Sequence, residues 1–187
     1  MNLSHSGLAD WGLTHIEIGT RFTILDVGCR GGRTIQKMAG LATEGMVYGI
    51  DFAEGSVAAS RAKNAGLIKA GRVDIKQASV SHLPFANASF DLVSAVETHY
   101  YWPDMLKDMQ EILRVLKPGA TFIILAESYH HNSKSNELQR LASKLLNFRE
   151  LSVDEHREMF LLSDFSDVQM FEERSKGWVC GIGRKPL

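Results

Sequence analysis

The sequence predicts an α/β fold in which parallel strands form a doubly wound sheet. Short apolar runs alternate with segments of helical periodicity, and the first two runs end in an aspartate that is followed by a loop. Alternating strands and helices imply right-handed crossovers and hence a parallel sheet. The expected strands cover residues 23–27, 46–50, 73–78, 90–96 and 120–126, and the expected helices lie near 32–42, 54–66 and 103–117.

Each end of the chain adds further elements to this alternating core. Residues 1–20 are expected to form a helical lead-in, and leucines at helical spacing predict another helix over 134–148. The segment Ser152-x-x-Glu155 is a capping box, which predicts the start of a further helix. The chain then ends in two expected strands and a tight turn between them: Val168–Glu173, Arg174-Ser175-Lys176 and Gly177–Ile182.

The composition fits one compact domain that spans residues 1–187. With 44% apolar and 23% charged residues, a chain of this length can bury a good core without cross-links. The two cysteines, Cys29 and Cys180, are too few and too far apart to predict a disulfide framework or a metal site. The sequence has no signal peptide pattern and no apolar stretch of about 18 residues. We therefore expect a soluble protein of the reducing cytoplasm, without a membrane span.

The charge balance argues against nucleic acid as a partner. The chain has 21 basic and 22 acidic residues, so its net charge of −1 predicts no broad phosphate-binding surface. The basic clusters at 61–63 and 69–72 are interrupted by apolar and small residues, which is typical of solvated helix faces. A nucleic-acid substrate is therefore disfavoured.

The most informative segment is the glycine-rich loop after the first expected strand. This strand contains Asp26 and runs directly into Gly28, Gly31 and Gly32, and a helical pattern follows. Glycine lets bare backbone approach a ligand, and the N–H groups and dipole of a helix N-terminus favour anionic groups. The loop therefore predicts a nucleotide-type cofactor site, with a plain strand-turn-helix connection as the alternative.

The spacing of the glycines distinguishes between classes of cofactor. The dinucleotide fingerprint requires glycine at its first, third and sixth positions, and here these positions hold Gly28, Arg30 and Arg33. No tyrosine of the chain is followed four positions later by lysine, so the short-chain reductase pair is also absent. An NAD(P)-dependent oxidoreductase is therefore disfavoured, and the frame that remains is Asp26-x-Gly28-x-x-x-Gly32.

A second carboxylate stands in register with this loop. Asp51 follows the expected strand 46–50 and lies 25 residues after Asp26. In nucleotide-binding folds an acidic residue in this region accepts hydrogen bonds from the ribose hydroxyls. The alternative role of Asp51 is that of N-cap for the helix that begins near Glu54. The register with Gly28 favours the ribose.

Together these segments resemble four motifs of the class I S-adenosylmethionine (SAM) dependent methyltransferases. The glycine loop is similar to motif I, Asp-x-Gly-x-Gly-x-Gly, with Arg30 in place of the middle glycine, and Asp51 has the position of the ribose-binding carboxylate. Residues 78–93 are similar to "Asp-Ala-x-x-Leu-Pro-Phe … Phe-Asp-Leu-Val", with Ser79 in place of the aspartate. Residues 114–119 match "Arg-Val-Leu-Lys-Pro-Gly", whose proline and glycine are expected to stop the helix. Within the family, these motifs most resemble those of the ubiquinone and menaquinone biosynthesis group (methyltransferase type 11).

The resemblance implies a Rossmann-like sheet of seven strands, mostly parallel and with an antiparallel C-terminal strand. Residues 23–126 would form the SAM-binding core, and the lead-in 1–20 would fold over the cofactor as part of a lid. Substrate selectivity would reside in the variable region 129–165, and residues 166–185 would form the closing hairpin. The cofactor would be SAM, with S-adenosyl-L-homocysteine (SAH) as its product.

The resemblance also assigns the cofactor contacts by position. In an open sheet of this type, ligands bind beyond the carboxyl ends of the strands at the switch point. Ser79, or the backbone at Ser79 and Val80, would hold the adenine, and Arg30 would point outward or toward the carboxylate of the methionine part. The expected cofactor-binding residues are Asp26, Gly28, Cys29, Arg30, Gly32, Asp51, Phe52, Ser79, Val80 and Glu97.

The loop after the fourth expected strand supplies the candidates for catalysis. Methyl transfer is an in-line displacement at a carbon that the sulfonium activates, so alignment and desolvation are the main factors, without a protein nucleophile or a metal. A base is useful if the acceptor carries a proton. The candidates are His99 and Tyr100, followed by His130 and His131. For Trp102 we expect packing at the start of the next helix.

The predicted activity is therefore SAM-dependent methylation of a small-molecule acceptor. The alternative is a methyltransferase fold that binds SAM or SAH weakly or without catalysis, and Arg30 and Ser79 are the observations behind it. No motif identifies the acceptor or the methylated atom, and the sequence leaves both a monomer and a homodimer open.

Overall fold

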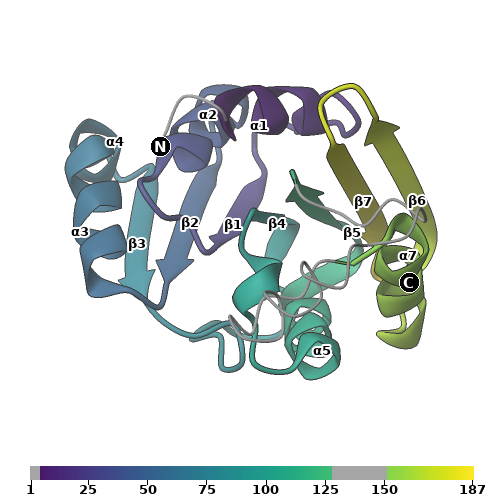
Figure 1. Ribbon diagram of the computed structural model, residues 1–187. Helices are drawn as coiled ribbons and strands as arrows, with labels where there is room; N and C mark the ends of the chain where they lie inside the picture. Colours follow the sequence, from purple (N-terminus) through teal and green to yellow (C-terminus); the bar gives the residue numbers. More distant parts are fainter. Residues whose placement is uncertain (1–4, 128–150) are drawn as a thin grey trace.

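A seven-stranded sheet runs through the protein in the order β3-β2-β1-β4-β5-β7-β6 (Figure 1). The computed structural model describes residues 5–127 and 151–187. Strands β1 to β5 are parallel, whereas β7 is antiparallel to both β5 and β6. This arrangement confirms the predicted fold. The strands are β1 (Thr23–Val27), β2 (Met46–Asp51), β3 (Val73–Gln77), β4 (Phe90–Val96), β5 (Leu116–Ala126), β6 (Ser166–Glu173) and β7 (Trp178–Arg184).

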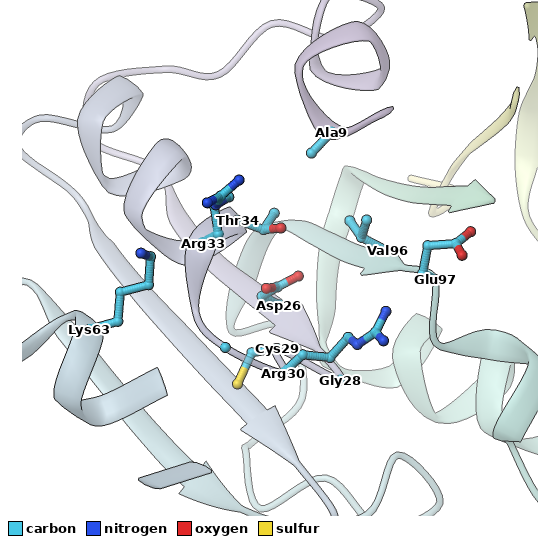
Figure 2. A pocket seen from close by; sticks show the side chains of 11 residues that line it. Ala9, Asp26, Gly28, Cys29, Arg30, Arg33, Thr34, Lys63, Val96 and Glu97 are labelled. Atoms are coloured by element: carbon cyan, nitrogen blue, oxygen red, sulfur yellow. The ribbon is translucent and has the colours of Figure 1, made fainter. Parts of the chain in front are cut away.

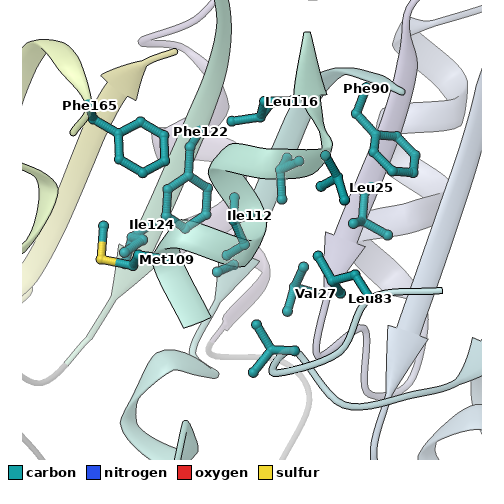
Figure 3. Packing of buried hydrophobic residues seen from close by; sticks show 14 of the residues in the cluster. Leu25, Val27, Leu83, Phe90, Met109, Ile112, Leu116, Phe122, Ile124 and Phe165 are labelled. Carbon is teal, nitrogen blue, oxygen red and sulfur yellow. The ribbon is translucent and has the colours of Figure 1, made fainter. Parts of the chain in front are cut away.

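The helices cover the two faces of the sheet, and each face has its own hydrophobic core. Because side chains alternate along a strand, neighbouring residues of β1 belong to different cores. Leu25 belongs to the core that includes Ile112 and Met109 of α5 on one face (Figure 3), and Ile24 belongs to the core that includes Met38 of α2 on the other. The helices are α1 (His5–Leu13), α2 (Arg33–Leu41), α3 (Glu54–Lys63), α4 (Ala65–Lys69), α5 (Met105–Val115) and α7 (Val153–Leu162), with a short 3-10 turn, η1 (His99–Tyr101).

The element boundaries follow the predictions, with two differences that tertiary contacts explain. The helix expected over 103–117 ends before Leu116, because Leu116 already pairs with Phe90 and begins the long strand β5. The helix expected over 54–66 divides at Asn64, which separates α3 from α4. The Asn64 side chain is buried and donates to backbone carbonyls, so the chain bends where this amide turns inward.

Most of the elements expected at the two ends of the chain are also present. The helical lead-in is shorter than expected, because α1 ends at Leu13 and a turn follows. The capping box is confirmed: the Ser152 hydroxyl accepts the Glu155 N–H, and the Glu155 carboxylate accepts the Ser152 N–H. The helix expected over 134–148 lies outside the described residues. In the part of the chain that the structure describes, no helix combines the length and the apolar character needed to cross a membrane.

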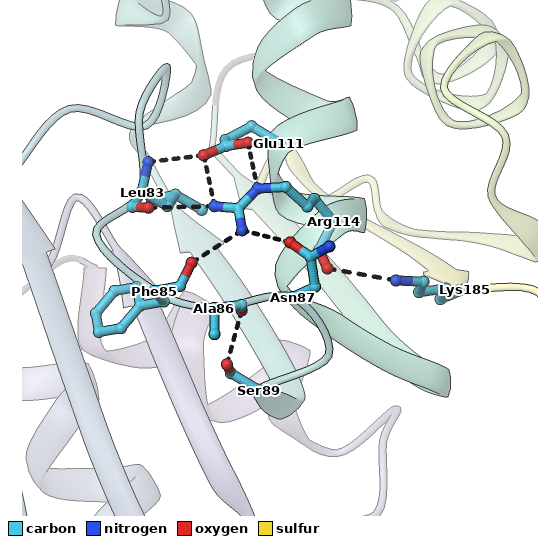
Figure 4. A network of polar contacts seen from close by, with 8 residues as sticks. All are labelled: Leu83, Phe85, Ala86, Asn87, Ser89, Glu111, Arg114 and Lys185. Carbon is cyan, nitrogen blue, oxygen red and sulfur yellow. Dashed lines mark hydrogen bonds and ion pairs between the residues drawn. The ribbon is translucent and has the colours of Figure 1, made fainter.

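Arg114 of α5 binds the loop that connects β3 to β4. Its guanidinium donates to the carbonyl oxygens of Leu83 (3.2 Å) and Phe85 (2.9 Å), and to Asn87 Oδ1 (2.8 Å). The Glu111 carboxylate accepts Arg114 Nε at 2.7 Å and the Leu83 N–H at 2.9 Å, which completes the network in Figure 4. Hydrogen bonds therefore join the Leu-Pro-Phe segment to the helix that carries the Arg-Val-Leu segment.

Replacing Arg114 with methionine is expected to lower the free energy of unfolding by about 1–3 kcal/mol, because charge-assisted hydrogen bonds to Glu111 and the loop are lost. Urea denaturation followed by circular dichroism measures this change. The control is Lys107→Met, which removes an ion pair whose two side chains are 80% and 45% exposed. An exposed pair of this kind contributes little to stability, because solvent screens it. Equal losses in the two variants would contradict a special role for the Arg114 network.

Candidate cofactor-binding site

Two adjoining cavities open at the carboxyl ends of β1, β2 and β4. The larger cavity has a volume of about 470 Å³ and the smaller one about 70 Å³. Gly28, Arg30 and Glu97 line both of them. This end of the sheet is its switch point, because β2 lies on one side of β1 and β4 lies on the other. Ligands of open α/β sheets bind at such a point.

Gly28 and Gly32 shape the glycine loop, because both residues have left-handed backbone angles. Their φ angles are +74° and +73°. A Cβ atom at Gly28 would overlap the Thr98 hydroxyl, and one at Gly32 would overlap the side chains of Ser60 and Asn64. Gly28 lines both cavities, whereas Gly32 lines neither and lets α3 approach the loop closely. The structure thus gives Gly32 a packing contact, and the cofactor contact expected of it stays a prediction.

Asp51 connects the glycine loop to the start of α3. Its Oδ2 accepts the Arg30 N–H at 2.8 Å, and its Oδ1 accepts the Ala53 N–H at 2.9 Å. The N-cap residue of α3 is Ala53 and not Asp51. Each carboxylate oxygen has a further lone pair, and Asp51 lines the larger cavity. The carboxylate can therefore accept hydrogen bonds from a pair of hydroxyls, such as those of a ribose.

Asp26 places a buried carboxyl group at the wall of the smaller cavity (Figure 2). Only 2% of its surface is exposed, and its Oδ1 accepts the Ser94 hydroxyl at 2.7 Å. Burial raises the pKa of Asp26 to about 7 from an ordinary value of 3.8; the Ser94 hydrogen bond opposes this rise and the charge of Asp51 adds to it. Because this group titrates near neutral pH, a bound cation would shift its charge state.

Three residues around the smaller cavity have no motif in the sequence that identifies them. Figure 2 shows Arg33, Lys63 and Ala9 around the glycine loop. Ala9 belongs to α1, which lies close to the sheet because Gly12 has no side chain to overlap Leu125. The fold brings these residues together from three helices, so only the cationic character of Arg33 and Lys63 offers a signal in the sequence.

Arg30 has the backbone conformation that glycine adopts easily. Its φ angle is +47°, its N–H donates to Asp51, and its exposed side chain lines both cavities. The loop therefore keeps its shape although a side chain replaces the middle glycine of motif I. The side chain is exposed and lines both cavities, so whether it points outward or toward the cofactor's carboxylate stays a prediction.

The substitution Arg30→Gly is expected to change the SAH dissociation constant by less than about threefold and stability by less than about 1 kcal/mol. Glycine relieves the left-handed conformation, but it also gives the unfolded chain more freedom, so the two effects oppose each other. Isothermal titration calorimetry and thermal unfolding measure the two quantities. A gain in affinity of about tenfold or more, near 1.4 kcal/mol, would show that Arg30 obstructs the loop.

Four other predicted cofactor residues differ in how they reach the cavities. Cys29 lines the smaller cavity, and burial raises the pKa of its thiol to about 12, which favours the protonated thiol. Phe52 lines the larger cavity with 79% of its surface exposed. Ser79 and Val80 are also wall residues there, and Ser79 Oγ accepts the Ser81 N–H at 3.2 Å.

Glu97 joins the two cavities and is held in place by hydrogen bonds. Its backbone is left-handed, with a φ angle of +57°. Its carboxylate accepts the Tyr100 hydroxyl at 3.0 Å and also the Glu127 N–H. Left-handed conformations of residues other than glycine are uncommon and cluster at functional sites. Glu97 thus lies at the junction of the two cavities, and its contact with the cofactor stays a prediction.

His99 and Tyr100 lie behind the cavity wall, unlike the sequence-based expectation. Each has only 3% of its surface exposed, and of the described residues it is their neighbours Tyr101 and Trp102 that line the larger cavity. Tyr100 is turned toward Glu97, and the His99 ring contacts His156 of α7. These buried contacts hold both rings away from the cavity. Catalytic roles for His99 and Tyr100 stay predictions.

Trp102 has the packing role expected of it and is also a wall residue. Its ring stacks on Phe122 with centroids 6.4 Å apart, within the core under α5. The same residue lines the larger cavity beside Tyr101, which is 70% exposed. The other predicted bases, His130 and His131, lie outside the described residues.

The fold and the site together define an α/β protein with two adjoining cavities at the switch point of its sheet. A family model described as "Methyltransferase domain" matches residues 25–124. The chain therefore belongs to this methyltransferase family, and the resemblance seen in the sequence is confirmed.

Curated proteins with similar sequences carry methyltransferase names. The chain is 34% identical over 115 residues to the O-methyltransferase resE of Aspergillus sclerotiorum, across 58% of this chain and 43% of that protein. It is 32% identical over 117 residues to the demethylmenaquinone methyltransferase of Lactiplantibacillus plantarum, across 62% of this chain and 49% of that protein. The chain thus spans about half the length of the curated relatives it matches.

Solved structures show the same fold. A methyltransferase in complex with the Trm112 methyltransferase activator of Haloferax volcanii has a TM-score of 0.81 at 22% identity, with 98% of this chain and 91% of that chain covered. Phosphoethanolamine N-methyltransferase 2 of Haemonchus contortus, in complex with SAH, has a TM-score of 0.82 at 16% identity, with 97% and 53% covered.

Proposed function

We propose that this chain binds S-adenosyl-L-methionine and transfers its methyl group to a small-molecule acceptor. The observation that carries the proposal is the position of Asp51, whose carboxylate lines the larger cavity and also binds the N–H of Arg30 in the glycine loop. The chain's membership of the methyltransferase family supports this assignment.

The residues of the two cavities fit the two ends of this cofactor. Asp51 would hold the ribose in the larger cavity, with Ser79 and Val80 beside the adenine. The methionine part would occupy the smaller cavity, where the Asp26 carboxyl suits an ammonium group and Arg33 suits a carboxylate. The absence of a side chain at Gly28, which lines both cavities, leaves room for backbone contact at the junction.

The chemistry requires alignment more than it requires a reactive protein group. The bound cofactor supplies a methyl carbon that its sulfonium activates for in-line displacement. The protein would contribute a fixed, water-poor position for the acceptor, and such alignment accounts for much of the rate of bimolecular reactions. Trp102 and Val80 form buried, apolar parts of the wall, and Tyr101 adds an exposed aromatic ring.

The acceptor proposed for this site is a small molecule. The chain is similar to proteins named O-methyltransferases and a demethylmenaquinone methyltransferase. The described wall of the larger cavity includes aromatic side chains, which favour an apolar or ring-shaped acceptor.

Two measurements test the proposal. Isothermal titration calorimetry with SAM and SAH is expected to give dissociation constants in the micromolar range. This range corresponds to a binding free energy on the order of −8 kcal/mol. Transfer of a radiolabelled methyl group from SAM is then screened against quinols, phenols, amines and thiols. The absence of binding heat and of a thermal shift with both ligands would contradict the proposal.

A second candidate is a methyltransferase fold that binds the cofactor without catalysis. Arg30 at the position of a glycine and Ser79 at the position of an aspartate are the observations that favour it. Binding of SAH with no methyl transfer to any acceptor class in the screen would support this candidate over the first.

A further inference from the structure

A buried pair of histidines joins the wall of the larger cavity to helix α7. His99 Nε2 and His156 Nε2 are 3.1 Å apart, although the two residues are separated by 57 positions in the sequence. His99 and His156 are 3% and 1% exposed. The contact therefore links η1, next to the cavity, to a helix that lines neither cavity with its described residues.

The hydrogen-bond partners determine which ring nitrogens carry protons. His156 Nδ1 lies 2.8 Å from the Ser152 carbonyl oxygen, which can only accept, so His156 Nδ1 must be the protonated nitrogen. A neutral His156 then has an unprotonated Nε2, which accepts the N–H of His99 Nε2. His99 Nδ1 is left as a buried acceptor with no hydrogen-bond partner among residues 5–127 and 151–187.

The surroundings keep both rings neutral. Burial lowers the pKa of His99, and the neighbouring His156 lowers it further. Burial also lowers the pKa of His156, although its bond to Ser152 and the charge of Glu155 act in the opposite direction. The Tyr100 ring covers His99 at a centroid distance of 4.1 Å. A neutral donor–acceptor pair is thus the state that this environment favours.

His99 lies next to residues that line the larger cavity, so the histidine pair affects the cavity wall. Thr98, Tyr101 and Trp102, next to His99 in the same turn, line the larger cavity. Thr98 also lies against Gly28, since its hydroxyl occupies the space that a Cβ atom there would need. A shift of His99 would therefore move the wall where the proposed acceptor would lie.

We propose that His156 is a positioning residue that acts through His99: its hydrogen bond fixes the turn 98–102, the part of the larger cavity's wall beside which the acceptor would lie. This inference rests on the proposed function, which assigns the acceptor to the larger cavity. The effect of His156 on the turn 98–102 does not depend on cofactor binding. It also gives α7 a role in the site although it lies far along the chain from the cofactor residues.

Three variants of the full chain test this inference. His156→Leu removes the hydrogen bond, and His156→Gln keeps an acceptor oxygen toward His99. The control, Arg157→Met, removes a different hydrogen bond of α7, the one to the Val168 carbonyl oxygen of β6. Hydrogen exchange read by mass spectrometry is expected to speed up about tenfold or more for amides 98–104 in His156→Leu only. Long-range ¹H–¹⁵N spectra are expected to show His99 protonated at Nε2 in the wild type and in His156→Gln.

The outcomes separate this inference from the proposed function. SAH affinity in His156→Leu is expected to stay within about threefold, because Asp51 and the glycine loop keep their contacts. Unchanged exchange of amides 98–104 in a folded His156→Leu protein, or an equal increase in Arg157→Met, would overturn the positioning role. A His99 ring protonated at Nδ1 in the wild type would overturn it as well. Absence of SAH binding in the wild type would instead contradict the proposed function.

Discussion

Asp51→Ala is expected to weaken SAH binding by about 100-fold, which corresponds to ~3 kcal/mol. The substitution removes two carboxylate oxygens that face the larger cavity, and hydrogen bonds to charged groups contribute about 1.5–3 kcal/mol each. It also leaves the N–H groups of Arg30 and Ala53 without their acceptor, so the glycine loop loses its connection to α3. Isothermal titration calorimetry of the variant and the wild type measures the change.

The matched control is Asp74→Ala in the neighbouring strand β3. Asp74 lines neither cavity, and its carboxylate pairs at 3.3 Å with Lys76, with both side chains about two-fifths exposed. Its removal is expected to change SAH affinity by less than about twofold, because exposed ion pairs contribute little. Similar losses in both variants, or full affinity in a folded Asp51→Ala protein, would contradict the assignment of Asp51 to the ribose.

The sheet and the cofactor loop were predictable because their signals are local. Each strand of the core is an apolar run with its own turn residues, and motif spacing fixes Gly28 and Asp51 at the ends of adjacent strands. Parallel neighbours bring their carboxyl ends to one edge, so the meeting of Asp51 with the glycine loop follows from topology alone. The structure shows how they meet, because the Asp51 carboxylate accepts a hydrogen bond from the Arg30 N–H.

The orientation of side chains near the site was less predictable, because it depends on contacts between distant segments. His99 and Tyr101 are two positions apart in one turn, yet the first is buried and the second is 70% exposed. The buried His99 ring lies 3.1 Å from that of His156, and no spacing in the sequence pairs the two residues. Likewise, Ala9 reaches the smaller cavity only because α1 packs on the sheet.

Asp26→Asn is expected to stabilise the free protein at pH 8 by about 2–4 kcal/mol, since each pKa unit corresponds to 1.36 kcal/mol. The pKa of Asp26 is about 7 in the folded protein, against an ordinary value of 3.8. Below the lower value the carboxyl is protonated in both states. As the pH rises toward 7 the unfolded chain ionises first, so the wild type progressively loses stability, and the loss is complete above about 7. Asparagine does not titrate and escapes this loss.

Urea denaturation of both proteins at pH 5 and pH 8 isolates this effect. The buried histidines also titrate, but they contribute equally to both proteins, so the difference between wild type and variant reports Asp26 alone. The advantage of the variant is expected to grow by about 2–3 kcal/mol between the two pH values. An Asp26→Asn protein that is less stable than the wild type at pH 8 would contradict a buried, high-pKa carboxyl.

The same substitution is expected to act on binding in the opposite direction. If the Asp26 carboxylate binds the cofactor's ammonium group, Asp26→Asn weakens SAH binding by about tenfold, a loss near 1.4 kcal/mol. Wild-type affinity should then rise between pH 6 and pH 8 as the carboxyl ionises, and calorimetry over this range measures the slope. Ser94→Ala removes the hydrogen bond that lowers the Asp26 pKa, so it should move this rise to higher pH. An SAH affinity of the wild type that does not change between pH 6 and pH 8 would contradict binding of the cofactor's ammonium group by Asp26.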